Sequence, residues 1–478
     1  MKKAYSIMAL IVLVVTNCSS DKNREKDNPL VGNGGIAMGG VLRVNEVECF
    51  RTLQPIAINE MNSYHISTQV YEGLVRYNQA DLSIIPAIAR SWETSPDLTE
   101  YTFHIRSGVR YHDDACFKDN FGREVNASDV LYCFENLCSK NKNNTQFDVT
   151  FKDRVVGANE FYEESKSGKV RTFGGITVLD DSTIKIRLIQ PDANFLNILA
   201  MPGCYIYPKE ADQKYGSQMR AKCVGTGPFY IFHLKEGEDI MMKRNRNYWG
   251  VDKQGNKLPY LDGVKWSFIQ DKKEEVMEFR RGKIDMIYNI PVEMFHEIFG
   301  DMNKRKQELQ FDIYSSPALS TQYYGFNLQT NPFFSIKEIR QAFNLAIDRQ
   351  KISDYTLKGE GRPAEYGIIP FTEVFEKNGY DYKSLNGFKY NPDSAKKLLA
   401  AVGYPMGKGL PDFTLEINSG GGERNIMVAL AIQKMLKENI GVNLNMSVVS
   451  WSEHVENVQA GKSDFYRYAW VSDYADPE

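Results

Sequence analysis

The end of the chain carries the residues whose types and spacing best suit binding chemistry. An aromatic strand is expected from Phe465 to Trp470, and a carboxylate, Asp473, follows between Trp470 and Tyr474. Strands of this kind that end at Asp and Pro are ordinary sheet edges. An acid between two aromatic rings can also bind a cation, such as the α-ammonium of a peptide, because the acid supplies charge and the rings exclude water. The residues alone leave both interpretations open.

Enzyme chemistry finds little support in the sequence. None of the six histidines pairs with another at i, i+4 spacing, so the helical zinc-protease pattern is absent. The run His112-Asp113-Asp114 is either a fragment of a metal site or, as we favour, a hairpin turn. No G-x-S-x-G elbow is present. We predict no catalytic residue, no metal site and no cofactor, but carboxylates assembled only by folding leave a glycosidase open.

Length and charge narrow the class of protein. A chain of 478 residues is too long for one core and predicts two or three domains. Hydrophobic residues make up 42% and charged residues 25%, which is typical of a globular protein. The formal net charge is −3, so nothing in the charge balance points to nucleic acid as a partner.

The N-terminus indicates export. Lys2 and Lys3 precede a short apolar run, Ile7 to Val15, which is typical of a secretory signal and too short to span a bilayer. Cys18 follows at the position of the lipidated cysteine in a bacterial lipobox, although Asn17 departs from the usual small residue. We predict a signal peptide over 1–17, lipidation at Cys18 and a flexible tether over 18–40. A plain signal peptide with an incidental cysteine is the alternative.

The other six cysteines do not reveal their state. An even number in an exported protein permits disulfides, yet the spacing selects no pairing and buried free thiols fit equally well. They are Cys49, Cys116, Cys133, Cys138, Cys204 and Cys223.

Periodicity indicates alternating strands and helices. Strands are expected at 41–44, 182–188, 415–417 and 442–449, and helices at 67–73, 126–137, 335–347, 391–403 and 426–436. Asn126 is placed to cap its helix, and Ser335 with Glu338 three residues later reads as a capping box. Asn391-Pro392 puts proline at the first helical position.

Several segments, in one common order over most of the chain, resemble the large solute-binding proteins of bacterial peptide ABC importers, the family 5 extracellular binding proteins. Each is weak alone, but their shared order is a specific signal. The segments are 71–74, 101–109, 126–130, 225–229, 244–249, 339–349, 391–404 and 470–477.

The resemblance implies an α/β fold of two lobes joined by a hinge, the periplasmic-binding-protein fold, with an extra subdomain in the first lobe. We accordingly assign lobe 1 to 41–315, its extra subdomain to about 75–170, and lobe 2 to 316–478. A ligand would lie enclosed between the lobes. The protein would be a monomer that passes small peptides to the permease subunits of an ABC transporter, held at the membrane by its lipid.

The resemblance also implies a ligand site. Asp473 falls where many peptide-binding members place the acid that pairs with the peptide ammonium, and Trp470 falls on the aromatic beside it. Tyr474 flanks the same acid, and Trp451 matches another aromatic of the pocket. Tyr323 and Asn327 are expected on the strand that leads into lobe 2 and can face the cleft.

One departure and two rival functions accompany this interpretation. The chain stops at Glu478, where family members continue and return to complete lobe 1, so we expect a weakened closed form in the chain as given. The first rival is the same fold with another cargo, such as a metal chelate, haem, a sugar or a cell-wall peptide. The second is an exported hydrolase that uses carboxylates in the cleft.

Overall fold

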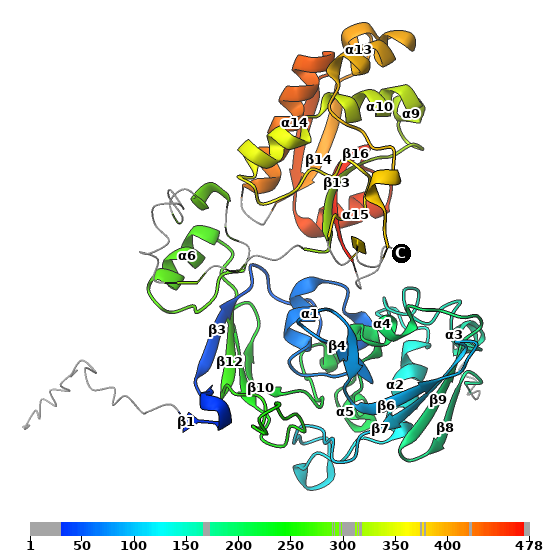
Figure 1. Ribbon diagram of the computed structural model, residues 1–478, viewed down its shortest axis with the longest axis vertical. Coiled ribbons are helices and arrows are strands. Elements are labelled where there is room, and N and C mark those ends of the chain that lie inside the picture. Colours follow the sequence, from blue (N-terminus) through cyan, green and yellow to red (C-terminus); the bar gives the residue numbers. More distant parts are fainter. Residues whose placement is uncertain are drawn as a thin grey trace, which may run out of the picture.

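The computed structural model describes residues 30–165, 173–288, 318–372, 379–419 and 423–472, together with a few positions between these ranges. They form two bodies, shown in Figure 1. We call lobe 1 the body from β1 (Leu30–Val31) to α6 (Lys272–Arg280), and lobe 2 the body from β13 (Ser320–Phe326) to β16 (Phe465–Val471). The predicted signal segment and Cys18 lie outside the described residues. Among the described residues, no helix is both long and apolar enough to cross a membrane.

Lobe 1 contains two four-stranded sheets. The first has the order β10–β11–β12–β3, in which β3 lies parallel to β12 and the other neighbours are antiparallel. The second has the order β6–β7–β9–β8 and is antiparallel throughout. The strands are β3 (Val41–Asn45), β10 (Phe229–Lys235), β11 (Asp239–Arg244), β12 (Gly263–Ser267), β6 (Ala89–Thr94), β7 (Glu100–Ile105), β8 (Ile176–Asp180) and β9 (Thr183–Arg187).

The second sheet begins within residues 75–170, the range assigned to an extra subdomain from the sequence. It continues to Arg187, past the limit near residue 170, because β8 and β9 pair with β7 after the intervening helices. One cluster of buried residues extends from Val44 in the first sheet to Ile184 in the second, so both sheets share a core. The smaller elements of lobe 1 are β2 (Ala37–Met38), α1 (Met61–Ser67), β4 (Val75–Tyr77), β5 (Ile84–Pro86), α2 (Ala127–Leu137), α3 (Ala158–Ser165), α4 (Phe195–Leu199) and α5 (Lys209–Tyr215).

The predicted helix from Ser67 to Gly73 is wrong. The chain has already completed α1 when it reaches Ser67. Beyond α1, the side chains of Val70 and Leu74 are buried although the backbone there is not helical. Glu72, between them, forms an isolated β-bridge with Ile206. Apolar residues four apart mimic a helical face here, although the burial comes from packing of an irregular segment.

Glu72 brings together three segments that are far apart in the sequence. Its buried carboxylate accepts hydrogen bonds from Thr226 Oγ1 at 2.8 Å, Tyr248 OH at 2.9 Å and Trp249 Nε1 at 3.0 Å. The Arg106 guanidinium lies over the Trp249 ring, 4.1 Å from its centroid. Burial outweighs these hydrogen bonds and raises the pKa of Glu72. Segments that looked like separate motifs in the sequence therefore meet at one buried acid.

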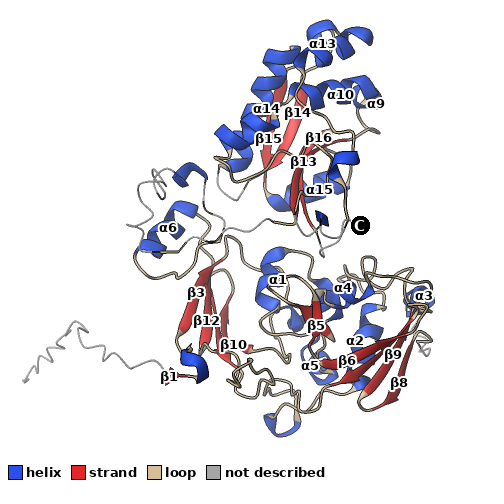
Figure 2. Ribbon diagram, viewed as in Figure 1, coloured by secondary structure: helices blue, strands red, loops and turns tan. Residues whose placement is uncertain are grey.

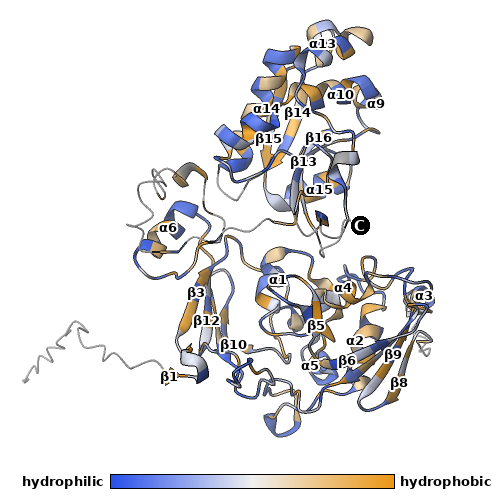
Figure 3. Cartoon of the chain, in the orientation of Figure 1, coloured by the Kyte–Doolittle hydropathy of each residue, from blue (hydrophilic) through white to orange (hydrophobic). Residues whose placement is uncertain are grey.

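Lobe 2 is built on the sheet β13–β16–β14–β15. Strands β14 (Phe413–Asn418) and β15 (Leu444–Val449) are parallel, β16 is parallel to β14, and β13 is antiparallel to β16. Helices α10 (Lys337–Ala346), α13 (Pro392–Ala401) and α14 (Arg424–Ile440) pack against one face, and β14 stands out as hydrophobic in Figure 3. The short helix α15 (Trp451–Gln459) contacts β14 through His454 and Glu416, on the other face (Figure 2).

Of the two predicted N-caps, the one at Asn126 is confirmed, and Pro392 is the first residue of α13, as predicted. The Asn126 side chain accepts from Asp129 N at 3.1 Å while Asp129 accepts from Asn126 N at 3.0 Å, a full capping box. Asn391 accepts from Ser394 N at 3.0 Å. The cap at Ser335 is wrong, because that residue ends a separate short helix, α9 (Pro332–Ser335), and its hydroxyl donates to Leu328 O.

Candidate functional site

The carboxyl ends of three parallel strands define one edge of lobe 2. Strands β14 and β15 end side by side at Asn418 and Val449, and β16 extends further in the same direction to Val471. The first residues of β13 lie beside the end of β16 because β13 runs in the opposite direction. Figure 1 shows this edge of lobe 2 turned towards lobe 1. In open α/β sheets, ligands bind beyond the carboxyl ends of the strands. This edge is therefore the candidate ligand site of lobe 2.

Aromatic side chains cover one face of the sheet near this edge. The Tyr468 ring lies 5.7 Å from the Trp451 ring and 6.0 Å from the Tyr323 ring, centroid to centroid. Trp470, two residues beyond Tyr468, projects on the same side of β16 and remains 52% exposed. We call Tyr323, Trp451, Tyr468 and Trp470 the aromatic face. Its exposed end offers an apolar wall to a ligand at the carboxyl edge.

Local structure fixes the direction of these rings. Pairing of β13 with β16 sets Tyr323 opposite Tyr468 and Thr321 opposite Trp470. The Ser450 side chain caps α15 by accepting from Glu453 N at 3.3 Å, which starts the helix at Trp451. One register and one helix start therefore assemble rings that lie far apart in the sequence.

The opposite side of β16 carries a buried positive charge that the sequence did not reveal. Arg467 is 9% exposed, and its guanidinium donates to Asn418 Oδ1 at 2.9 Å and to Gln322 Oε1. Both partners are neutral amides, and among the described residues no carboxylate forms an ion pair with Arg467. Burial lowers the pKa of Arg467, and the nearby Arg424 lowers it further. A buried cation without a counter-ion favours an anionic group on a ligand.

The structure brings three of the predicted site residues together. Trp451, Trp470 and Tyr323 all contribute to the aromatic face. Asp473 and Tyr474 lie outside the described residues, just beyond Ser472.

Asn327 lies elsewhere, at the opposite end of β13 from the carboxyl edge. Its backbone N–H donates to Asp464 O at 2.7 Å, and its side chain donates to Gly461 O at 3.1 Å and accepts from Gln329 N at 3.0 Å. These bonds close the turn that precedes β16. We therefore leave Asn327 out of the proposed site.

His112 has a structural environment. It is buried, its Nε2 lies 2.9 Å from Gly227 O, and burial lowers its pKa to about 4. No cluster of metal-ligating side chains occurs within the part of the chain that the structure describes. The six cysteines from Cys49 to Cys223 are all free, which answers the question that their spacing left open.

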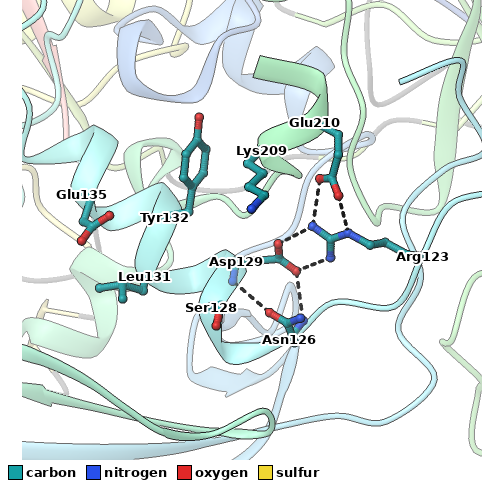
Figure 4. Close-up of a pocket in the computed structure, with 9 residues that line it drawn as sticks. All are labelled: Arg123, Asn126, Ser128, Asp129, Leu131, Tyr132, Glu135, Lys209 and Glu210. Carbon is teal, nitrogen blue, oxygen red and sulfur yellow. Dashed lines mark hydrogen bonds and ion pairs between the residues drawn. The ribbon is translucent and has the colours of Figure 1, made fainter. Parts of the chain in front are cut away.

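A pocket of about 370 Å³ in lobe 1, shown in Figure 4, has its central charges paired internally. Arg123 donates to both Asp129 oxygens at 2.6 and 2.7 Å and to both Glu210 oxygens at 2.7 and 2.9 Å. The guanidinium lowers the pKa of Glu210. This arrangement ties α2 to α5 and leaves the central arginine no free charge for a ligand.

Comparison with known proteins identifies the fold and the family. The model of the bacterial extracellular solute-binding proteins, family 5, matches residues 83–478. The chain belongs to this family. It is 29% identical to haem-binding protein A of Haemophilus influenzae over 89% of this chain and 73% of that protein. It is 27% identical to the periplasmic oligopeptide-binding protein OppA of Escherichia coli over 89% of this chain and 74% of that protein.

Solved structures agree with the two-lobed α/β fold. The DppA periplasmic binding protein of Helicobacter pylori, in complex with the peptide STSA, superposes with a TM-score of 0.72 at 27% identity, over 92% of this chain and 80% of that one. An oligopeptide-binding protein of Borrelia burgdorferi superposes with a TM-score of 0.75 at 24% identity, over 91% of this chain and 81% of that one. This family 5 protein thus has the periplasmic-binding-protein fold of the solute-binding subunits of ABC importers, and the relatives compared are binding proteins.

Proposed function

We propose that this protein is a lipid-anchored receptor that captures peptides between its lobes and delivers them to the permease subunits of an ABC importer. The observation that carries the proposal is the arrangement at the carboxyl edge of lobe 2. There, the aromatic face and the buried Arg467 lie on opposite sides of the strand that leads to Asp473. A peptide offers what these groups need, namely an ammonium for Asp473, a carboxylate for Arg467 and side chains for the aromatic face.

The peptide backbone would bind without reading sequence. Strand β13 is an edge strand of the sheet formed by the described residues, where one of its sides has no partner strand. An extended peptide can add to such an edge, and main-chain hydrogen bonds then supply affinity that is independent of side chains. Charge at the peptide ends sets the register. Lobe closure removes water from the charged contacts and couples the closed state to the ligand.

Asp473→Asn tests the site. We expect free-amine peptides to bind more weakly by about 2–5 kcal/mol, because the ammonium loses the charged partner that we propose for it. Isothermal titration calorimetry with a short peptide and its N-acetylated form measures this difference. Asp464→Asn is the matched control: Asp464 precedes the same strand at its other end and bonds to Thr330 and Asn331. Equal affinity in Asp473→Asn and its parent would remove Asp473 from the site.

A non-peptide cargo is the second candidate, favoured by the relative whose name describes haem binding. Flat aromatic walls also suit a flat, apolar ligand. Native mass spectrometry of the purified protein, followed by denaturation, identifies what co-purifies. Mixed masses that fragment as peptides support the peptide receptor, whereas one non-peptide mass supports the alternative. Recovery of cleaved peptide instead of intact ligand would indicate a hydrolase.

The lipid anchor has its own test. If Cys18 carries lipid, Cys18→Ser moves the protein from the membrane fraction to the soluble fraction after export, and the parent shows the mass of added acyl chains. Unchanged membrane association in Cys18→Ser would refute the anchor without touching the ligand site.

A further inference from the structure

Beneath the aromatic face lies a histidine that the sequence pattern did not single out. His454 of α15 is 0% exposed and sits between two strands. Its Nδ1 lies 2.7 Å from Glu416 Oε1 on β14, and its Nε2 lies 2.7 Å from the main-chain oxygen of Arg467 on β16. The ring also contacts two members of the aromatic face, with centroids 6.1 Å from Trp451 and 5.9 Å from Tyr468.

Chemistry fixes the direction of one of these two hydrogen bonds. A main-chain oxygen can only accept, so Nε2 must carry a proton. The Glu416 carboxylate accepts when ionised, so Nδ1 must then donate as well; otherwise Glu416 carries that proton and donates it to Nδ1. Asn457 donates to the second Glu416 oxygen at 3.2 Å, which orients the carboxylate. The imidazole is therefore held in one orientation from two strands at once.

His454 is the most deeply buried contact of helix α15 with the sheet. Among its nine residues, Trp451–Gln459, only His454 is buried. Trp451 lies three positions before His454 and hence on the same side of the helix, one turn earlier. Fixing the imidazole consequently fixes the first turn of α15 and the indole on it.

We propose that His454 is a positioning residue for the ligand site, which aligns Trp451 against Tyr468 by bridging Glu416 and the Arg467 carbonyl. The expected effect of His454 on peptide affinity rests on the proposed function. The expected effect of His454 on the orientation of Trp451 does not, because it concerns the protein without ligand. A residue that merely filled space here would be replaceable by phenylalanine, which has a similar ring and no hydrogen bonds.

His454→Phe tests this directly in the intact protein. The near-UV circular dichroism contributed by Trp451 is obtained as the difference between each protein and its Trp451→Phe derivative, because a rigidly packed indole gives a defined signal. We expect His454→Phe to lose this signal and to bind a short free peptide about tenfold more weakly. The matched control is His112→Phe, which removes the buried, hydrogen-bonded histidine of lobe 1. It should lower stability while keeping the Trp451 signal and peptide affinity.

A second pair of variants keeps the test decisive if His454→Phe does not fold. Glu416→Ala removes one partner of the ring from another element and should also lose the Trp451 signal, whereas Glu416→Gln keeps a hydrogen-bonding partner and should retain it. Retention of both signal and affinity in His454→Phe, or of the signal in Glu416→Ala, would overturn the proposal. If the parent binds no peptide, the proposed function fails, and the Trp451 signal alone still decides the role of His454.

Discussion

Replacing Trp470 by alanine should weaken ligand binding strongly and leave the fold stable. Trp470 is 52% exposed at the end of β16, so about half of its surface is available to a ligand. An aromatic side chain offers roughly 150–250 Å², of which half is roughly 75–125 Å². At about 25 cal/mol per Å², covering this area contributes about 2–3 kcal/mol. The dissociation constant should therefore rise about 30- to 150-fold.

Isothermal titration calorimetry at several temperatures measures both the affinity and its origin. Loss of about 100 Å² of buried apolar surface should make the heat-capacity change of binding less negative by about 45 cal/mol/K. Thermal unfolding of the free protein should change much less than binding, because Trp470 lies at the end of its strand and is not part of the hydrophobic core of lobe 2. Phe121→Ala is the control, since Phe121 is 68% exposed in lobe 1. Binding by Trp470→Ala within twofold of the parent would show that the aromatic face does not contact ligand.

Three further predictions concern lobe 1. Glu72→Ala should lower the free energy of unfolding by about 3–5 kcal/mol, because three donors lose their buried acceptor, and chemical denaturation should show a smaller loss for Glu72→Gln. The folded pKa of His112 is lowered from 6.5 to about 4, so stability should fall by about 3 kcal/mol as pH drops from 6.5 to 4, and His112→Gln should remove that part of the pH dependence. Burial raises the pKa of the thiols of Cys133, Cys138 and Cys204, so a thiol reagent at pH 8 should modify these three only after denaturation. Rapid modification in the native state would contradict their burial.

Local signals in the sequence predicted many elements correctly. Asn126 and Asn391 cap their helices because a side chain and a backbone N–H three residues apart meet in every such turn. The alternation of apolar and polar residues over 182–188 correctly predicted strand β9, because one face of that strand is buried. Ser335 carried the same local signal, and tertiary contacts overrode it: its hydroxyl is engaged by Leu328 O, and α10 begins without a side-chain cap.

Long-range assembly accounts for what the sequence could not predict. The partners of Arg467, Asn418 and Gln322, lie 49 and 145 positions away, and only strand order brings them together. His454 and Glu416 are separated by 38 positions and meet because α15 returns across β14. Trp451, Trp470 and Tyr323 were proposed from the family resemblance, which carries information about assembly that no single segment holds, and their role in binding stays a prediction.

The alternation of β16 has a consequence for how ligand preference can change. Phe465 and Arg467 face the buried side of lobe 2, whereas Tyr466, Tyr468 and Trp470 face the opposite side. Codons for the second group can therefore vary while those for the first stay constant, so that new specificities arise without refolding the lobe. A library restricted to these three positions would be a compact starting point for engineered biosensors. Inserting a single residue into the strand, by contrast, would exchange the two sides and abolish fold and recognition together.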